Sequence, residues 1–262
     1  VSDGGVAIKP LAPKIDGYTF GGWYKDAAFQ TEWDFANDTV TNDTIIYGKL
    51  NKNHYSITYK SNEPTDASGN KLNVATGTMP QDATVTTATD GTQTGGKEHG
   101  KPYPLSDAKP TLTGYDFKGW ATSETGPVAY QPGEQYLIDA DLTLWAVWAK
   151  KTYTVTVSSG AGYSTVPAGI NTVAHGDTFK LVINVERQYA SKAPTISYTY
   201  TDENGTHTVN LESAKDTTKD LKYESGDTQI VHPARWVYQI TGVKKDDSIE
   251  IGVTPNEVQR VL

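Results

Sequence analysis

Gly17-Tyr18-Thr19-Phe20-Gly21-Gly22-Trp23 and Gly114-Tyr115-Asp116-Phe117-Lys118-Gly119-Trp120 are two copies of one phrase, G-Y-x-F-x-G-W. After each copy the chain passes through a variable stretch and then enters an apolar closing segment, residues 44–50 in the first copy and 142–148 in the second. Similarity that recurs along one chain is the signature of a repeat protein. The sequence therefore predicts two units in tandem.

The phrase has a physical interpretation. Its tyrosine and phenylalanine fall on one side of a strand, the glycine before the tyrosine suits a turn, and the glycine before the tryptophan permits close approach of another backbone. A buried tryptophan contributes about 4–6 kcal/mol from about 150–250 Å² of buried surface, before entropy is subtracted. Core packing is therefore favoured over exposed rings that stack on sugars. The expected structural anchors are Gly17, Tyr18, Phe20, Trp23, Gly114, Tyr115, Phe117 and Trp120.

These residues resemble the internalin B-type B repeat, also called the Listeria/Bacteroides repeat, which occurs in arrays on bacterial surface proteins. The resemblance covers about residues 1–150 and includes Asp3-Gly4-Gly5, both phrases, Pro132-Gly133 and the closing segment at 142–148. It implies that each unit is a compact β-grasp-like fold, a curved sheet with a short helix. It also implies a place outside the cell.

The chain departs from the family pattern in three places. The first copy lacks most of its opening strand, and Leu50 stands where the second copy has Trp148. Residues 62–102 form a long insertion rich in Thr, Gly and Asp. We expect this insertion to be a mobile loop or an edge-strand loop, with partner binding as the alternative.

A third module is expected after residue 150. Short alternating runs, beginning with residues 153–157, and an Asn204-Gly205 turn are typical of a β-sandwich, which loosely resembles the immunoglobulin-like domains that accompany such repeats. The predicted fold class is all-β or β-rich. The predicted domains are residues 1–50, residues 51–150 with the insertion, and residues 151–262.

Composition excludes several function classes. The net charge of −8 comes without a basic stripe for nucleic acid, and no apolar run is long enough for a membrane helix. The absence of cysteine excludes disulfides and thiol catalysis. A start at Val1 without a leader suggests a piece excised from a longer chain.

No catalytic, cofactor or metal site is predicted. The five histidines lack metal-ligand spacing and are interpreted as surface or loop residues, and no G-x-S-x-G turn is present. Asp139-Ala140-Asp141 and Asp246-Asp247 lack the remainder of a calcium loop. Lys150 or Lys151 is a conceivable donor for an intramolecular amide cross-link, which an intact mass would test.

The leading hypothesis is a non-enzymatic extracellular region of a bacterial cell-surface or cell-wall protein, acting as a stalk or spacer or in adhesion. The alternatives are a module that binds a carbohydrate or host protein, and an accessory region of a larger secreted enzyme. The expected partners are a host or cell-wall protein or a glycan, without nucleic acid or membrane insertion. The sequence sets no ligand and no oligomeric state.

Overall fold

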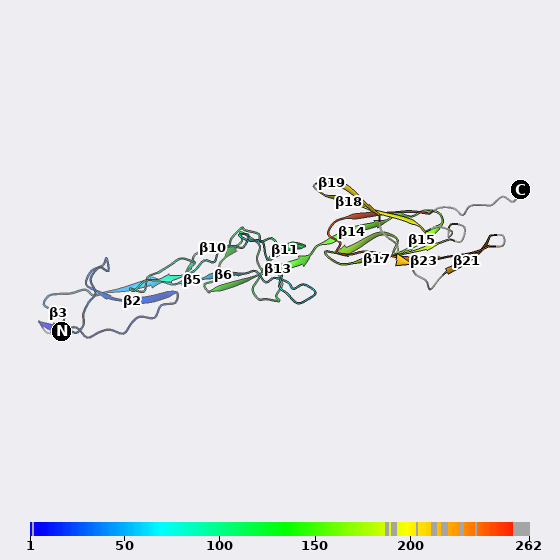
Figure 1. The fold of residues 1–262 in the computed structure, drawn as a ribbon. Helices are drawn as coiled ribbons and strands as arrows, with labels where there is room; N and C mark the ends of the chain where they lie inside the picture. The colour runs from blue at the N-terminus through cyan, green and yellow to red at the C-terminus, as the bar shows by residue number, and fades with distance from the viewer. Residues whose placement is uncertain are drawn as a thin grey trace. The chain divides into compact units, whose positions relative to one another are not determined.

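The computed structural model describes residues 1, 3–186, 189, 193–202, 204–210, 214–215, 220–225, 228–233 and 235–253. The fold of these residues is all-β, as predicted (Figure 1). They include no α-helix, so the short helix that the resemblance implied is absent from the described residues, and none of them forms a helix that could span a membrane. The chain divides into two compact units. The first comprises residues 1–113 and 117–149, and the second comprises residues 114–116 and 150–262.

The N-terminal part of the first unit is built on two antiparallel strand pairs. Its strands are β1 (Gly5–Val6), β2 (Tyr18–Tyr24), β3 (Thr39–Val40) and β4 (Tyr47–Lys52). The first phrase forms β2, which pairs with the closing strand β4, while β1 pairs with β3. The β2–β4 register shifts between Phe20 and Gly22, which marks a bulge beside the phrase's tryptophan.

The remainder of the first unit is centred on a three-stranded sheet in the order β11-β13-β6. The strands of this part of the unit are β5 (His54–Tyr55), β6 (Ile57–Lys60), β7 (Thr86–Thr87), β8 (Gln93–Thr94), β9 (Lys97–Glu98), β10 (Tyr103–Pro104), β11 (Tyr115–Ala121), β12 (Gln135–Tyr136) and β13 (Leu142–Lys150). The second phrase forms β11. Strand β6 runs parallel to the closing strand β13.

One hydrophobic core supports this sheet. Its buried members are Ile57, Tyr59, Leu105, Trp120, Tyr136, Leu142, Leu144 and Ala146. The indole of Trp120 is fully buried, and its ring centroid lies 4.9 Å from those of both Tyr59 and Phe117. In the first copy Trp23 packs on Phe20 at 5.1 Å and is only half-buried. The two copies of the phrase therefore pack to different depths.

The insertion at residues 62–102 is folded. Strands β7 and β8 form a short antiparallel hairpin, which agrees with the edge-strand interpretation. Asp90, in its turn, pairs with Lys49 of β4 at 2.6 Å, and its carbonyl accepts a hydrogen bond from the side chain of Asn51 at 3.1 Å. The insertion of the second copy therefore packs back onto the closing strand of the first.

The second unit contains two large sheets around one core. Its strands are β14 (Thr152–Val157), β15 (Tyr163–Val166), β16 (Gly169–Ala174), β17 (Phe179–Val185), β18 (Thr195–Asp202), β19 (Gly205–Asn210), β20 (Ala214–Lys215), β21 (Asp220–Ser225), β22 (Thr228–Pro233), β23 (Arg235–Ile240) and β24 (Asp247–Gly252). The sheets have the orders β16-β14-β24-β18-β19 and β15-β17-β23-β20. Val155 and Ile249 from one sheet and Ile183 and Trp236 from the other belong to the same core. The predicted hairpin is present, with Asp202 opposite Gly205.

Candidate functional site: a glycine–histidine joint at each phrase

A histidine covers the glycine that opens the first phrase. Gly17 has a left-handed backbone (φ +75°), and a Cβ at this position would overlap the imidazole of His99. Asn53 links the two, because its N–H donates to the carbonyl of Gly17 at 2.9 Å and its carbonyl accepts the N–H of His99 at 2.8 Å. The hydroxyl of Tyr55 lies 3.3 Å from His99 Nδ1. We call this set of four residues the first joint.

The same arrangement recurs inside the second unit and is called the second joint. Gly114 (φ +79°) has no room for a Cβ because the ring of His175 lies over it. The N–H of Lys151 donates to the carbonyl of Gly114 at 2.9 Å, and the N–H of His175 donates to the carbonyl of Lys151 at 2.8 Å. The hydroxyl of Tyr153 lies 3.1 Å from His175 Nδ1.

The two joints also share their backbone context. In each, the tyrosine pairs across an antiparallel ladder with the residue two positions before the histidine, which is Lys97 in the first joint and Val173 in the second. A glycine with left-handed φ follows each histidine, Gly100 at +72° and Gly176 at +78°. The same local arrangement therefore occurs both in the short β5–β9 pair and in the β14–β16 pair of a five-stranded sheet.

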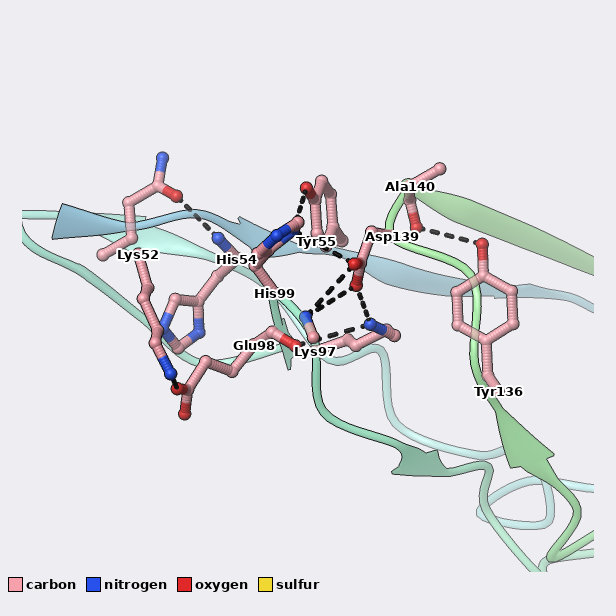
Figure 2. Close-up of polar contacts among 11 residues, drawn as sticks. Lys52, His54, Tyr55, Lys97, Glu98, His99, Tyr136, Asp139 and Ala140 are labelled. Atoms are coloured by element: carbon pink, nitrogen blue, oxygen red, sulfur yellow. Dashed lines mark hydrogen bonds and ion pairs between the residues drawn. The ribbon is translucent and has the colours of Figure 1, made fainter. Parts of the chain in front are cut away.

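The first joint carries a polar cluster around one carboxylate (Figure 2). Asp139 contacts the ammonium of Lys97, whose side chain is completely buried. Its other oxygen lies 3.1 Å from His99 Nδ1, and the N–H of Gly100 donates to both carboxylate oxygens, at 3.0 and 3.1 Å. These hydrogen bonds, that from Lys97 first, hold the pKa of Asp139 below its ordinary value, so the carboxylate is ionised at neutral pH.

Further polar contacts frame this cluster. Glu98 receives hydrogen bonds from Lys101 at 2.6 Å and from Lys52 at 2.8 Å, and together these lower its pKa to about 2. The hydroxyl of Tyr136 donates to the carbonyl of Ala140 at 3.1 Å (Figure 2). Every charged group named here has a partner, as polar groups inside folded proteins usually do.

The carboxylate pairs considered as metal ligands have other partners. Asp139 binds the first joint, and Asp246 accepts the N–H of Thr154 at 2.6 Å. Asp247 is buried, and burial raises its pKa. Among the residues that the structure describes, no group of three or more histidines and carboxylates is arranged to hold a metal ion.

His99 and His175 lie in turns, which agrees with the interpretation of the histidines as surface or loop residues, but that interpretation missed that each ring packs on a glycine. His99 and His175 are partly buried and pack on glycines because left-handed, Cβ-free backbone leaves room for a ring. His54 binds a backbone carbonyl of the insertion at 2.6 Å, and His207 stacks on a tyrosine at 4.9 Å. The side chain of His232 lies outside the described residues. The available signal was the His-Gly dipeptide, which occurs at both joints.

The predicted anchor residues fall into two groups: the glycines that open the phrases lie in the joints, and most of the aromatic residues pack on other rings. Gly17 and Gly114 belong to the joints, and Tyr18 lies edge-on to His99 at 6.0 Å. The tryptophans and phenylalanines contact one another within each copy. Tyr115 is half-buried. Whether all eight residues stabilise the fold stays a prediction.

Comparison with known proteins identifies the repeats. A model of the Listeria-Bacteroides repeat domain matches residues 1–49 and 55–147, just over half of the chain. The chain belongs to the Listeria-Bacteroides repeat family. The resemblance inferred from the phrase is therefore confirmed, and the joints are features of a Listeria-Bacteroides repeat protein.

Relatives of this repeat protein are much longer than the chain. A protein of Evansella cellulosilytica whose name describes it as a Gly-rich membrane protein is 26% identical over 61% of this chain and 15% of its own length. Internalin H of Listeria monocytogenes serovar 1/2a is 27% identical over 54% of this chain and 21% of its own length. The chain thus spans about a fifth or less of either relative. No solved structure shows a significant match.

Each lysine considered as a cross-link donor lies in an exposed ion pair. Lys150 Nζ forms an exposed ion pair with Asp177 at 2.7 Å, and Lys151 Nζ lies 4.0 Å from Asp116. The buried Lys97 faces a carboxylate that is held ionised, which is a poor electrophile for amide formation. We expect an intact mass equal to that of the plain sequence. A mass lower by one water, from a Lys–Asp amide, or by one ammonia, from a Lys–Asn amide, would contradict this expectation.

The two members of the buried ion pair are expected to respond unequally to substitution. Lys97→Met should leave the midpoint of thermal unfolding unchanged or raise it, since Val173 occupies the equivalent position in the second joint. Asp139→Ala should lower the midpoint because the buried ammonium of Lys97 then lacks its counter-charge. Calorimetry of the full chain measures both. A midpoint that falls for Lys97→Met and stays unchanged for Asp139→Ala would show that the fold requires Lys97 itself.

The second joint should make the second unit sensitive to mild acid. Burial, followed by the nearby charges of Lys244, Lys150 and Lys151, lowers the pKa of His175. Below about pH 6.5 the unfolded chain therefore binds this proton more readily than the folded one, and stability falls as the pH is lowered. Hydrogen exchange of β14 and β16 between about pH 7 and 5.5, corrected for intrinsic rates, measures the loss. His175→Gln should flatten the dependence, and an unchanged slope in this variant would contradict the assignment.

Proposed function

We propose that this chain is a non-catalytic region of an extracellular bacterial surface protein, where it acts as a stalk or spacer between functional parts. The observation that carries the proposal is the joint, which is built twice with the same contacts. A chain that reuses one connecting geometry is suited to serial arrangement, as in other repeat proteins. Membership of the repeat family and the names of the relatives support a surface location.

The finer description of the fold belongs to this proposal. We infer β-grasp-like repeats at residues 1–50 and 51–150 and an immunoglobulin-like sandwich at residues 151–262. The parallel pairing of β6 with β13 and the two sheets of the second unit support these assignments. The eight phrase residues are proposed to anchor the repeats, and the burial of Trp120 supports this for the second copy.

Recognition of a glycan or of a host or cell-wall protein has less support. Sugar binding by stacking needs aromatic rings on an open face. No aromatic side chain that the structure describes is exposed, and all six tryptophans are at least half-buried. Adhesion through this chain would therefore depend on polar or aliphatic surface.

The spacer role is tested on living cells that display the full protein, in which this chain is either deleted or replaced by another module. An antibody epitope placed beyond the chain, on the side away from the cell, reports how far that part projects. Deletion of the chain should reduce antibody binding to intact cells, and an unrelated rigid β-module of similar length should restore it. Restoration by the native chain alone would contradict the spacer role and favour specific binding.

A further inference from the structure

A small hollow lies beside the core of the second unit. It has a volume of about 200 Å³ and is lined by Tyr198 and Tyr200 of β18, residues 240–245 and Asp247 of β24. Tyr198 also packs against the hydrophobic core. Pockets for drug-sized ligands measure about 300–1,000 Å³, so this hollow suits a single small chemical group.

The backbone around the hollow is held by three hydrogen bonds. The N–H of Gly176 donates to the carbonyl of Val243 at 2.6 Å, and the N–H of Val243 donates to the carbonyl of Asp177 at 3.0 Å. The carboxylate of Asp246 accepts the N–H of Thr154 at 2.6 Å. The wall formed by residues 240–245 is therefore fixed before any ligand arrives.

One buried carboxylate in this hollow accepts no hydrogen bond. Asp247 is only 9% exposed, and no residue that the structure describes donates a hydrogen bond to its carboxylate. It lies on the same side of β24 as Ile249, which has no exposed surface, since side chains alternate along a strand. Buried polar groups are nearly always hydrogen-bonded, so this carboxylate points to a ligand that donates hydrogen bonds.

The hollow already accommodates one ammonium group. Nζ of Lys245 lies 4.4 Å from the centroid of the Tyr200 ring, which is a cation–π distance, and the ring of Tyr198 stacks on that of Tyr200 at 6.0 Å. Asp247 forms no ion pair with this ammonium. An ammonium that reached both the ring and the carboxylate would gain a charge-assisted hydrogen bond that Lys245 does not make.

The lining favours an ammonium over other small ligands. Calcium takes six to eight oxygen ligands, and among the described residues that line the hollow Asp247 alone carries a carboxylate. A sugar ring that stacks needs an open aromatic face, and both tyrosines are only partly exposed. An anion would meet the buried negative charge of Asp247.

We propose that this hollow binds a primary ammonium group at the end of an alkyl chain, as in a lysine side chain of a partner protein. Asp247 accepts its hydrogen bond and Tyr200 supplies the cation–π contact. Lys245 is then a competitor within the chain and leaves the ring when the ligand binds. Lys244 also lines the hollow, but it is exposed and its charge is screened by solvent. This proposal is independent of the spacer role and goes beyond it.

The test titrates the full 262-residue chain with Nα-acetyl-lysine amide and follows the backbone amide NMR signals of Tyr200 and Gly242. Nα-acetyl-norleucine amide, which has no ammonium, is the matched control ligand. The lysine probe should shift both signals in a saturable way, and the norleucine probe should not. Equal shifts with the two probes would overturn the proposal.

Two substitutions should change the affinity in opposite directions. Asp247→Asn should weaken binding by about tenfold or more, because the charged acceptor is lost. Lys245→Met should tighten binding by about threefold or more, because the probe no longer displaces an ammonium from Tyr200. Lys180→Met, an exposed position of β17, is the matched control variant and should leave the affinity unchanged.

The Lys245→Met variant also covers the case in which Asp247→Asn fails to fold. Absence of a saturable shift in this variant up to about 100 mM lysine probe would overturn the proposal, since such a site would be weaker than any useful binding energy. An affinity that falls in Lys245→Met would overturn it as well, because Lys245 would then be part of the site. Displacement of the lysine probe by calcium chloride, but not by sodium chloride of equal ionic strength, would instead assign the hollow to a metal ion.

Discussion

Trp120→Ala is expected to lower the free energy of unfolding of the second repeat by about 3–5 kcal/mol, the usual cost of emptying a buried tryptophan site. The side chain has no exposed surface and lies between Tyr59 of β6 and Phe117 of β11. Its loss would leave a cavity beside Tyr59 and Phe117, which lie on the two strands that flank β13. Chemical denaturation of the full chain, combined with hydrogen exchange of β13, measures the effect.

Trp23→Ala is the matched control within the same molecule. The phrase around it has the same pattern, but the ring is half-buried and packs on Phe20 of its own strand. Less apolar surface returns to water, so the cost should be roughly half that of Trp120→Ala. Equal costs for the two substitutions would contradict the difference in packing between the copies.

Gly17→Ala is expected to destabilise the first joint by about 2–5 kcal/mol. About 1–2 kcal/mol arises from an alanine in left-handed backbone, and about 1–3 kcal/mol from the ring of His99, which must move to admit the methyl group. Gly114→Ala should behave in the same way against His175, since its φ and its covering ring are alike. Thermal unfolding and hydrogen exchange at β9 and β16 report the two changes.

Gly77 supplies the control for backbone strain alone. Its φ of +76° matches that of Gly17, and a Cβ there would meet no atom within 4 Å. Gly77→Ala should therefore cost only the conformational part, about 1–2 kcal/mol or less in a loop. A cost for Gly17→Ala no greater than that for Gly77→Ala would show that the histidine is not packed on the glycine.

The sequence made the strands and the repeat predictable because both depend on local pattern. Alternation of apolar residues in segment 142–148 indicates a strand wherever it occurs, and the doubled phrase indicates repetition without any knowledge of contacts. The Asn204-Gly205 turn is likewise a local signal. The family resemblance rested on the same residues.

The joints were not predictable because their members are distant in sequence. Nothing near Gly17 indicates that His99 will lie over it, and a histidine in a polar loop is ordinarily a surface residue. The burial of Lys97 was also hidden, since lysine is rarely buried without a partner and its partner Asp139 belongs to another strand connection. The complete burial of Trp120 depends on its contact with Tyr59, which lies about 60 residues before it in the sequence.

The joints support the spacer proposal because they hold backbone segments in fixed positions. A histidine seated on left-handed glycine fixes one backbone against another through two main-chain hydrogen bonds, without cysteine or metal. Because the residue across the ladder from the joint's tyrosine can be Lys97 or Val173, the geometry tolerates different cores around it. We expect other members of the repeat family with a His-Gly dipeptide after the phrase to form the same contact.

The most direct test of the joint is a double-mutant cycle between Gly17 and His99. In a His99→Ala background the ring that overlaps the new methyl group is absent, so Gly17→Ala should cost no more than Gly77→Ala. This account predicts a coupling free energy of about 1–3 kcal/mol between the two positions. Equal costs of Gly17→Ala in the presence and absence of the imidazole would contradict it.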